Sequence, residues 1–185
     1  RADYVTQVDG TWLLKPNVDL STVKLGLPDS IHGLVLAHLD RLPESHKLTL
    51  KVSSVLGYYI DLVLVKDVHP EEKDVAQIEA EAAYMEAEEV VHQEMPDRKI
   101  YAFRQQTTQE VAYQTLLHAQ RQQLHQTVAE TLVQQQPDAT IVIAHHAFLA
   151  ELWSLALPYN LLAGEWAKKL YANQQAIAFL QKAWH

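Results

Sequence analysis

Apolar residues recur every three or four positions over most of this sequence, which predicts a mainly helical protein. The pattern predicts a first helix that Asp29 or Ser30 caps. Three further helices are expected over 43–57, 61–68 and 70–88. The apolar residues that recur at helical spacing are Ile31, Leu34, Val35, Leu39, Leu42, Val75, Ile78, Ala82 and Met85. Leu48, Val52, Val55 and Leu56 are expected to form the buried face of the helix over 43–57.

Local signals indicate where these helices begin and end. Pro43 and Pro70 suit the first turn of a helix, where the missing N–H is not needed. Asp61 can cap the helix over 61–68, and Gly57 suits the end of the helix before it. The few glycines and prolines in the chain force few turns, which also favours helix.

Alternating residues predict two β-hairpins. The first has β-prone runs on either side of Asp9-Gly10 and is followed by a loop over 16–28. The second joins strands over 89–94 and 99–104. With a short strand at 58–60, three helices followed by this hairpin form the order of a winged helix-turn-helix.

The second half of the chain is helical again. A helix is expected from Thr107 or Thr108, and helices over 141–152, 155–171 and 174–184 should lie helix on helix, as at the start of a solenoid. We expect Pro158 near a helix start, because in a helix interior it would cost about 3 kcal/mol.

A glutamine-rich run that ends at Pro137 and Asp138 is the best internal boundary. The domain organisation that we predict is a hairpin with a lead-in loop, a winged-helix-like domain, a helical connector and a truncated repeat of TPR type. Their ranges are 1–28, 29–104, 105–136 and 137–185.

Composition narrows the class of protein. The formal net charge is −8, whereas a nucleic-acid-binding domain usually has a basic footprint. No apolar run approaches the roughly 20 residues that span a bilayer, and the chain has no cysteine. We therefore expect a cytoplasmic piece of a longer protein that contacts neither membrane nor nucleic acid, and no disulfides or thiolate metal sites.

The sequence lacks the usual signatures of catalysis and of nucleotide binding. Its five glycines are scattered and form neither a phosphate-binding loop nor a dinucleotide fingerprint. No serine lies in a nucleophile elbow, and the carboxylates over 71–97 form no isolated pair in an apolar setting. We predict no catalytic residue and no cofactor in this chain.

Ten histidines raise the question of a metal site. His145 and His146 are adjacent, so on a helix they diverge by about 100°. His118 and His125 share a face but lie two turns apart. No HExxH motif occurs, so we predict surface or half-buried hydrogen-bonding groups rather than metal ligands.

The helix over 70–88 occupies the place of a DNA-reading helix. Lys73 is its one cation, and phosphate would repel its carboxylates, which include Glu71, Glu72, Asp74, Glu79, Glu81 and Glu86. The large aromatic residues could form a partner surface, but we expect helical spacing to bury most of them. They are Trp12, Trp153, Trp166, Trp184, Tyr113, Tyr159 and Tyr171.

Several blocks of residues resemble the region that follows the P-loop domain in STAND-type signalling ATPases, which are fused to class III adenylate/guanylate cyclases or to serine/threonine kinases. The resemblance covers roughly residues 10 to 180. The first blocks are Leu27-Pro28-Asp29-Ser30-Ile31-His32-Gly33-Leu34-Val35, Leu39-Asp40-Arg41-Leu42 and Leu50-Lys51-Val52-Ser53-Ser54-Val55-Leu56-Gly57. The later ones are Phe103-Arg104, Gln109-Glu110-Val111-Ala112-Tyr113, Leu116-Leu117, Arg121, Leu124-His125 and Val128-Ala129.

The resemblance implies a regulatory region with winged-helix and TPR-like parts, and ATP with magnesium only in an upstream domain. Gly164, Ala176 and Ala183 fall at small-residue positions of a TPR helix pair. His38 stands where the family usually has arginine, and Gln105 where it often has histidine. No nucleotide-sensing role is therefore carried over to these two positions.

Three functions are compatible with these observations. The first is a relay of nucleotide state to an effector such as a cyclase or kinase, through contacts with other domains of the same polypeptide. The second is a winged-helix DNA-binding regulator, which the acidic helix over 70–88 disfavours. The third is a static helical scaffold that binds protein partners.

Overall fold

The computed structural model describes residues 5–8, 11–14 and 29–184. Strands β1 (Val5–Val8) and β2 (Thr11–Leu14) pair in antiparallel fashion, as the first predicted hairpin requires. The Asp9-Gly10 turn and the whole of the predicted loop over 16–28 lie outside the described residues.

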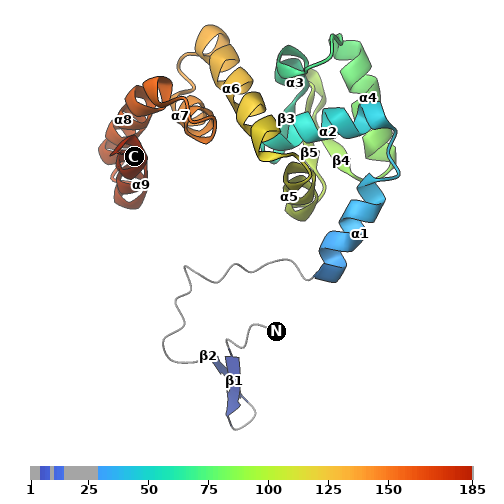
Figure 1. The fold of residues 1–185 in the computed structure, drawn as a ribbon, viewed down its shortest axis with the longest axis horizontal. Helices are drawn as coiled ribbons and strands as arrows, with labels where there is room; N and C mark the ends of the chain where they lie inside the picture. The colour runs from blue at the N-terminus through green and yellow to red at the C-terminus, as the bar shows by residue number, and fades with distance from the viewer. Residues whose placement is uncertain (1–4, 9–10, 15–28, 185) are drawn as a thin grey trace.

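The described chain is mainly helical, with a small antiparallel sheet inside its first half (Figure 1). The strand order is β3-β5-β4, so the last strand lies between the other two. This arrangement confirms the predicted winged-helix-like order of elements, including the short strand near Tyr59. The elements are α1 (Asp29–Leu39), α2 (Glu44–Leu56), β3 (Tyr59–Asp61), α3 (Leu62–Val68), α4 (Val75–Ala87), β4 (Val91–Met95), the 3-10 turn η1 (Pro96–Arg98) and β5 (Ile100–Phe103).

We call α2 to β5 the winged-helix unit. Two of its predicted caps are confirmed, because the Asp61 carboxylate accepts from the Val63 N–H at 2.9 Å and Gly57 ends α2 with a φ of 115°. The predicted start of the third helix at Pro70 is wrong. Asp74 and Gln77 form a capping box in which each side chain accepts from the other's backbone N–H, so α4 begins at Val75.

Five more helices follow the sheet: α5 (Gln106–Gln114), α6 (His118–Gln135), α7 (Thr140–Leu149), α8 (Trp153–Lys169) and α9 (Asn173–Trp184). We call α6 to α9 the helical arm. Helix α6 lies against the winged-helix unit, and α7, α8 and α9 follow on its other side, each packed on the one before (Figure 1). This confirms the helix-on-helix order expected for the second half.

The position of Pro158 differs from the prediction. Helix α8 starts at Trp153, so Pro158 lies inside it rather than in its first turn. Because proline lacks a backbone N–H, it cannot donate the helical hydrogen bond to the carbonyl of Ser154, four residues earlier. Both residues are exposed, so water can hydrate that carbonyl.

One apolar core extends from Leu39 in α1 to Ile143 in α7. Its fully buried members include Leu50, Ile78 and Phe103 of the winged-helix unit. The core therefore continues without a break from the winged-helix unit into the first helices of the arm.

Candidate functional site

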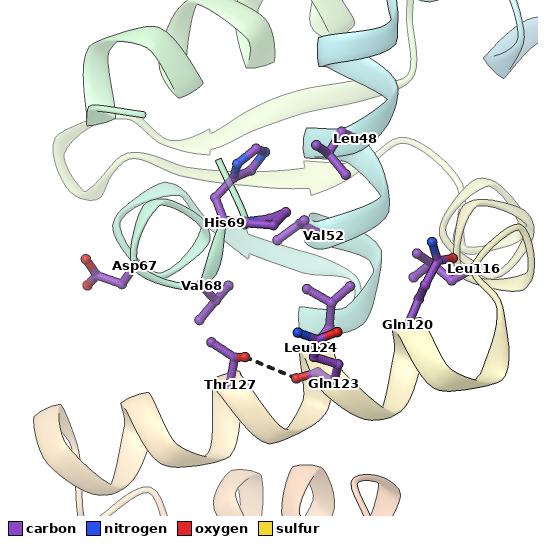
Figure 2. Close-up of a pocket in the computed structure, with 11 residues that line it drawn as sticks. Leu48, Val52, Asp67, Val68, His69, Leu116, Gln120, Gln123, Leu124 and Thr127 are labelled. Carbon is purple, nitrogen blue, oxygen red and sulfur yellow. Dashed lines mark hydrogen bonds between the residues drawn. The ribbon is translucent and has the colours of Figure 1, made fainter. Parts of the chain in front are cut away.

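A groove of about 300 Å³ lies where α6 packs against α2 and the end of α3 (Figure 2). We call it the junction groove, because one wall belongs to the winged-helix unit and the other to the arm. Its apolar lining consists of Leu48, Val52, Val68, Pro70, Leu116 and Leu124. Its polar lining consists of Asp67, His69, Gln120, Gln123 and Thr127. An apolar floor with a polar edge suits one apolar side chain or a small ligand.

A buried polar network lies behind the groove, between α2 and α4. The hydroxyl of Thr49 donates to Glu81, and the ammonium of Lys73 is 2.9 Å from the same carboxylate. The side chains of Lys73 and Glu81 are only 10% and 12% exposed. Although burial acts to raise it, the hydrogen bonds from Thr49 and Lys73 keep the pKa of Glu81 below its usual value.

The network also defines the protonation of His69. Because Thr49 donates its proton to Glu81, it must accept from Nε2–H of His69, 3.1 Å away. Nδ1 of His69 then accepts from the N–H of Glu71 at 3.1 Å. Burial lowers the pKa of His69, which favours this neutral form. The sequence analysis did not single out Thr49. The one signal that could have found it is that a polar residue stands within the apolar face of α2.

Two histidines that the sequence placed at or near the surface are instead fully buried. His125 and His146 are 1% and 2% exposed, and their Nδ1 atoms are 2.7 Å apart across the α6–α7 contact. Nε2 of His125 is also bonded to the Tyr113 hydroxyl at 2.9 Å. The divergence of His145 from His146 is confirmed, since His145 is exposed while His146 points into the contact. No local sequence signal links two histidines 21 positions apart.

The solvent face of α4 is less acidic than the sequence predicts. Three of its carboxylates fold back onto the protein: Glu79 is paired with Lys99 at 2.6 Å, Glu81 with Lys73, and Glu86 with the Gln93 N–H at 2.9 Å. The exposed residues of this helix are Ala76, Gln77, Ala80, Ala83, Tyr84 and Ala87. Within the described structure, α4 therefore presents a nearly uncharged surface without lysine or arginine.

The prediction that most large aromatic residues are buried is wrong for the arm. Trp153, Trp166 and Tyr171 are 49%, 63% and 88% exposed. Tyr113 and Tyr159 are partly buried against the core. The reason is that α8 packs against α7 and α9, and α9 against α8, so apolar positions outside these contacts remain at the surface. The side chains of Trp12 and Trp184 are not among those described.

Of the three small residues expected at helix contacts, Gly164 and Ala176 are buried and Ala183 is half-buried. Gly164 is buried, and a Cβ built on it would lie 3.0 Å from the Leu180 side chain, so its lack of a side chain allows α9 to approach α8. Ala176 is also buried. His38 is half-buried near the end of α1, and the exposed Gln105 precedes α5, where its side chain accepts from Thr107.

Two further observations concern only the described residues. No group of three or more histidine, aspartate or glutamate side chains is arranged to hold a metal ion. No helix is both long and apolar enough to cross a membrane. Comparison with protein-family models, with curated proteins and with solved structures gives no match for this chain.

Proposed function

We propose that this chain is a non-catalytic regulatory region of a multidomain signalling ATPase. In this proposal it relays the nucleotide state of an upstream P-loop domain to an effector such as a nucleotide cyclase or a kinase. The resemblance to STAND-type ATPases supports the proposal, and ATP and magnesium would bind in that upstream domain. A cytoplasmic location is part of the proposal, since a chain without cysteine suits a reducing compartment.

The observation that carries the proposal is the continuous core between the winged-helix unit and the arm. Coupling between distant sites needs an element whose packing both sites can bias. A shift of the winged-helix unit would have to be accommodated by α5 and α6, because both helices pack directly against α2.

The contacts at this junction suit such a rearrangement. The side chain of Gln109 on α5 donates to the Ser54 carbonyl on α2 at 2.6 Å. The side chain of Gln135 on α6 donates to the Asp67 carboxylate on α3 at 2.9 Å. Both are single hydrogen bonds from glutamine amides, which are worth about 1 kcal/mol each and can re-form with water. The junction groove, which Asp67 helps to line, leaves room for side chains to move.

The test is hydrogen exchange on the chain extended by its natural upstream segment, with and without ATP. We expect ATP to change amide protection within residues 28–132. The same extension with the P-loop lysine replaced by alanine is the control, since it should lose the nucleotide effect. Unchanged protection across 28–132 in the unaltered protein would refute the relay.

A static scaffold is a second candidate, and the exposed apolar surface of the arm favours it. Leu161, Leu162, Trp166 and Ile177 are all at least 44% exposed. Such a surface suits contact with another protein. The scaffold would be supported if ATP changed nothing while Trp166→Ala abolished binding to a domain of the same polypeptide.

A further inference from the structure

The buried histidine pair lies inside the helical arm, between α6, which packs on the winged-helix unit, and α7. His125 belongs to α6 and His146 to α7, and the two Nδ1 atoms share one hydrogen bond at 2.7 Å. Tyr113 of α5 extends the chain of hydrogen bonds to a third helix. Such a bond between neutral imidazoles needs one donor and one acceptor, so the two facing nitrogens hold one proton between them.

The groups around the pair do not compensate an added positive charge. Burial lowers the pKa of both imidazoles, and besides the two imidazoles themselves, the Arg121 guanidinium and the exposed His145 are the groups whose charge lowers it further. Burial also lowers the pKa of His145, and the charge of Lys182 on α9 lowers it further. Tyr113 contributes a neutral hydroxyl.

Carboxylates on the elements packed around the pair are engaged elsewhere or face solvent. On α3, Asp67 accepts from Gln135 and Lys66. On α5 and α6, Glu110 and Glu130 accept from glutamine amides. The exposed carboxylates of the arm's loops and of α8 are Asp138, Glu151 and Glu165. Among the described residues, no carboxylate accepts a hydrogen bond from either imidazole.

Proton addition to this pair is therefore unfavourable in the packed state. A first proton would place a charge in a buried site without a counter-charge. A second would place N–H groups on both facing nitrogens, which removes the hydrogen bond and sets two cations against each other. Both imidazoles can be protonated freely only when α7 separates from α6.

The rest of the α6–α7 contact combines one large apolar side chain with small ones. Ile143 of α7 is fully buried in the apolar core that also holds Val128 and Leu132 of α6. Beside the histidine pair, a small cluster of alanines, Ala129, Ala147 and Ala156, joins α6, α7 and α8. Because an alanine buries little apolar area, this cluster adds little to the stability of the contact. His146 and Ile143 are the two large buried side chains of α7, so a charge added to the histidine pair should weaken the packing of this helix.

We infer that the His125–His146 pair is an acid-sensitive latch, which holds α7 on α6 while neutral and releases α7 to α9 when both imidazoles take up protons. The winged-helix unit keeps its fold during this release, because Ile143 is the one residue of α7 among the described buried members of the apolar core. The inference goes beyond the relay and does not depend on an upstream nucleotide-binding domain.

The direction of the pH effect follows from the pKa values. Burial lowers the pKa of His125 to about 4 and that of His146 to about 3. The released state keeps the ordinary value of 6.5. The latch is therefore fully effective above pH 6.5 and weakens as the pH falls towards 4. Release that takes up two protons becomes more favourable by up to about 100-fold per pH unit.

The test is hydrogen exchange of the 185-residue chain between pH 7 and pH 4.5, corrected for the intrinsic pH dependence of exchange. We expect amides over 140–184 to lose protection steeply, with an opening constant that depends on nearly two protons. Amides over 44–103 should remain protected at the same pH. The latch would be overturned if both regions lost amide protection at the same pH. It would also be overturned if the opening constant depended on fewer than one proton.

A pair of variants separates the latch from general acid sensitivity. The double variant His125→Leu/His146→Leu replaces both imidazoles by apolar groups, and its arm should show no steep opening between pH 6.5 and 4.5. His118→Gln changes an exposed histidine on the same helix and should behave as the unaltered chain. Equal opening in the double variant and the unaltered chain would contradict the inference.

A second measurement does not depend on the variants being folded. NMR titration of the histidine ring nitrogens in the unaltered chain should show His125 and His146 still neutral just below pH 6.5, where the arm remains packed. Titration of either His125 or His146 near pH 6.5 in the packed state would overturn the latch.

Discussion

At the scale of single residues, the informative positions are polar groups in buried surroundings. A buried polar group is costly unless it is hydrogen-bonded, so each such group in a fold calls for a partner. Thr49 meets this requirement by joining His69 to Glu81. Asn160 does so only in part, because its amide donates to Ala156 while its buried Oδ1 has no partner among the described residues.

The Thr49 network leads to a prediction about stability. Thr49→Val keeps the shape of the side chain but removes the acceptor for His69 and a donor to Glu81. We expect the free energy of unfolding to fall by about 1–3 kcal/mol, the cost of leaving buried polar groups unpaired. Urea unfolding followed by circular dichroism measures this change.

Thr127→Val is the matched control. Its hydroxyl donates only to the Gln123 carbonyl within α6, at the edge of the junction groove. Substitutions at such sites usually change stability by less than about 0.5 kcal/mol. Equal losses in the two variants would show that the buried network adds nothing to stability.

At the scale of elements, the helix ends differ most from the sequence prediction. Glu89, Glu151 and Tyr171 each follow a helix with a positive φ near 58°. In each case the next residue donates back across the turn, for example Leu152 to the Ala147 carbonyl at 3.0 Å, which is a Schellman motif. Glycine is the usual signal for this turn, so its absence explains why the predicted helices ran on past the observed ends.

Helix α8 offers a test of element stability, because Pro158 lies inside it and is exposed. Pro158→Ala restores a hydrogen-bond donor without removing buried area. We expect the free energy of unfolding to rise by roughly 1–3 kcal/mol, where the upper limit is the full cost of proline in a helix interior. Thermal or urea unfolding measures the gain.

Pro137→Ala provides the comparison, since Pro137 is exposed and lies between α6 and α7. Replacing this rigid residue gives the unfolded chain more conformational entropy, which should lower the free energy of unfolding by less than about 1 kcal/mol. A lower stability for Pro158→Ala than for the unaltered chain would mean that the proline itself shapes the packing of α8.

At the scale of the whole molecule, the distribution of charge argues against nucleic acid as a partner. The net charge is −8, and α4, in the place of a DNA-reading helix, exposes alanines rather than cations. Affinity for DNA depends on phosphate neutralisation by lysine and arginine. The fold order alone therefore does not imply the function with which it is commonly associated.

This charge distribution predicts the outcome of a gel shift. The unaltered chain should not retard duplex DNA even at low salt. A variant with Ala76→Lys, Ala80→Lys and Ala83→Lys places three cations on the exposed face of α4 and should bind weakly, with an affinity that falls steeply as salt rises. Tight binding by the unaltered chain would favour the DNA-binding alternative.

The amino-acid sequence by itself determined the helices, the hairpins and their winged-helix order. These follow from periodicity and from local caps such as Asp61 and Gly57, which act between residues close in the chain. Only the tertiary structure decided which distant polar groups meet, as His125 meets His146 and Thr49 meets Glu81. It also decided that the aromatics of the arm stay exposed. The physical reason is that a periodic pattern tells which face of a helix is apolar, whereas the partner of that face depends on how separate elements pack together.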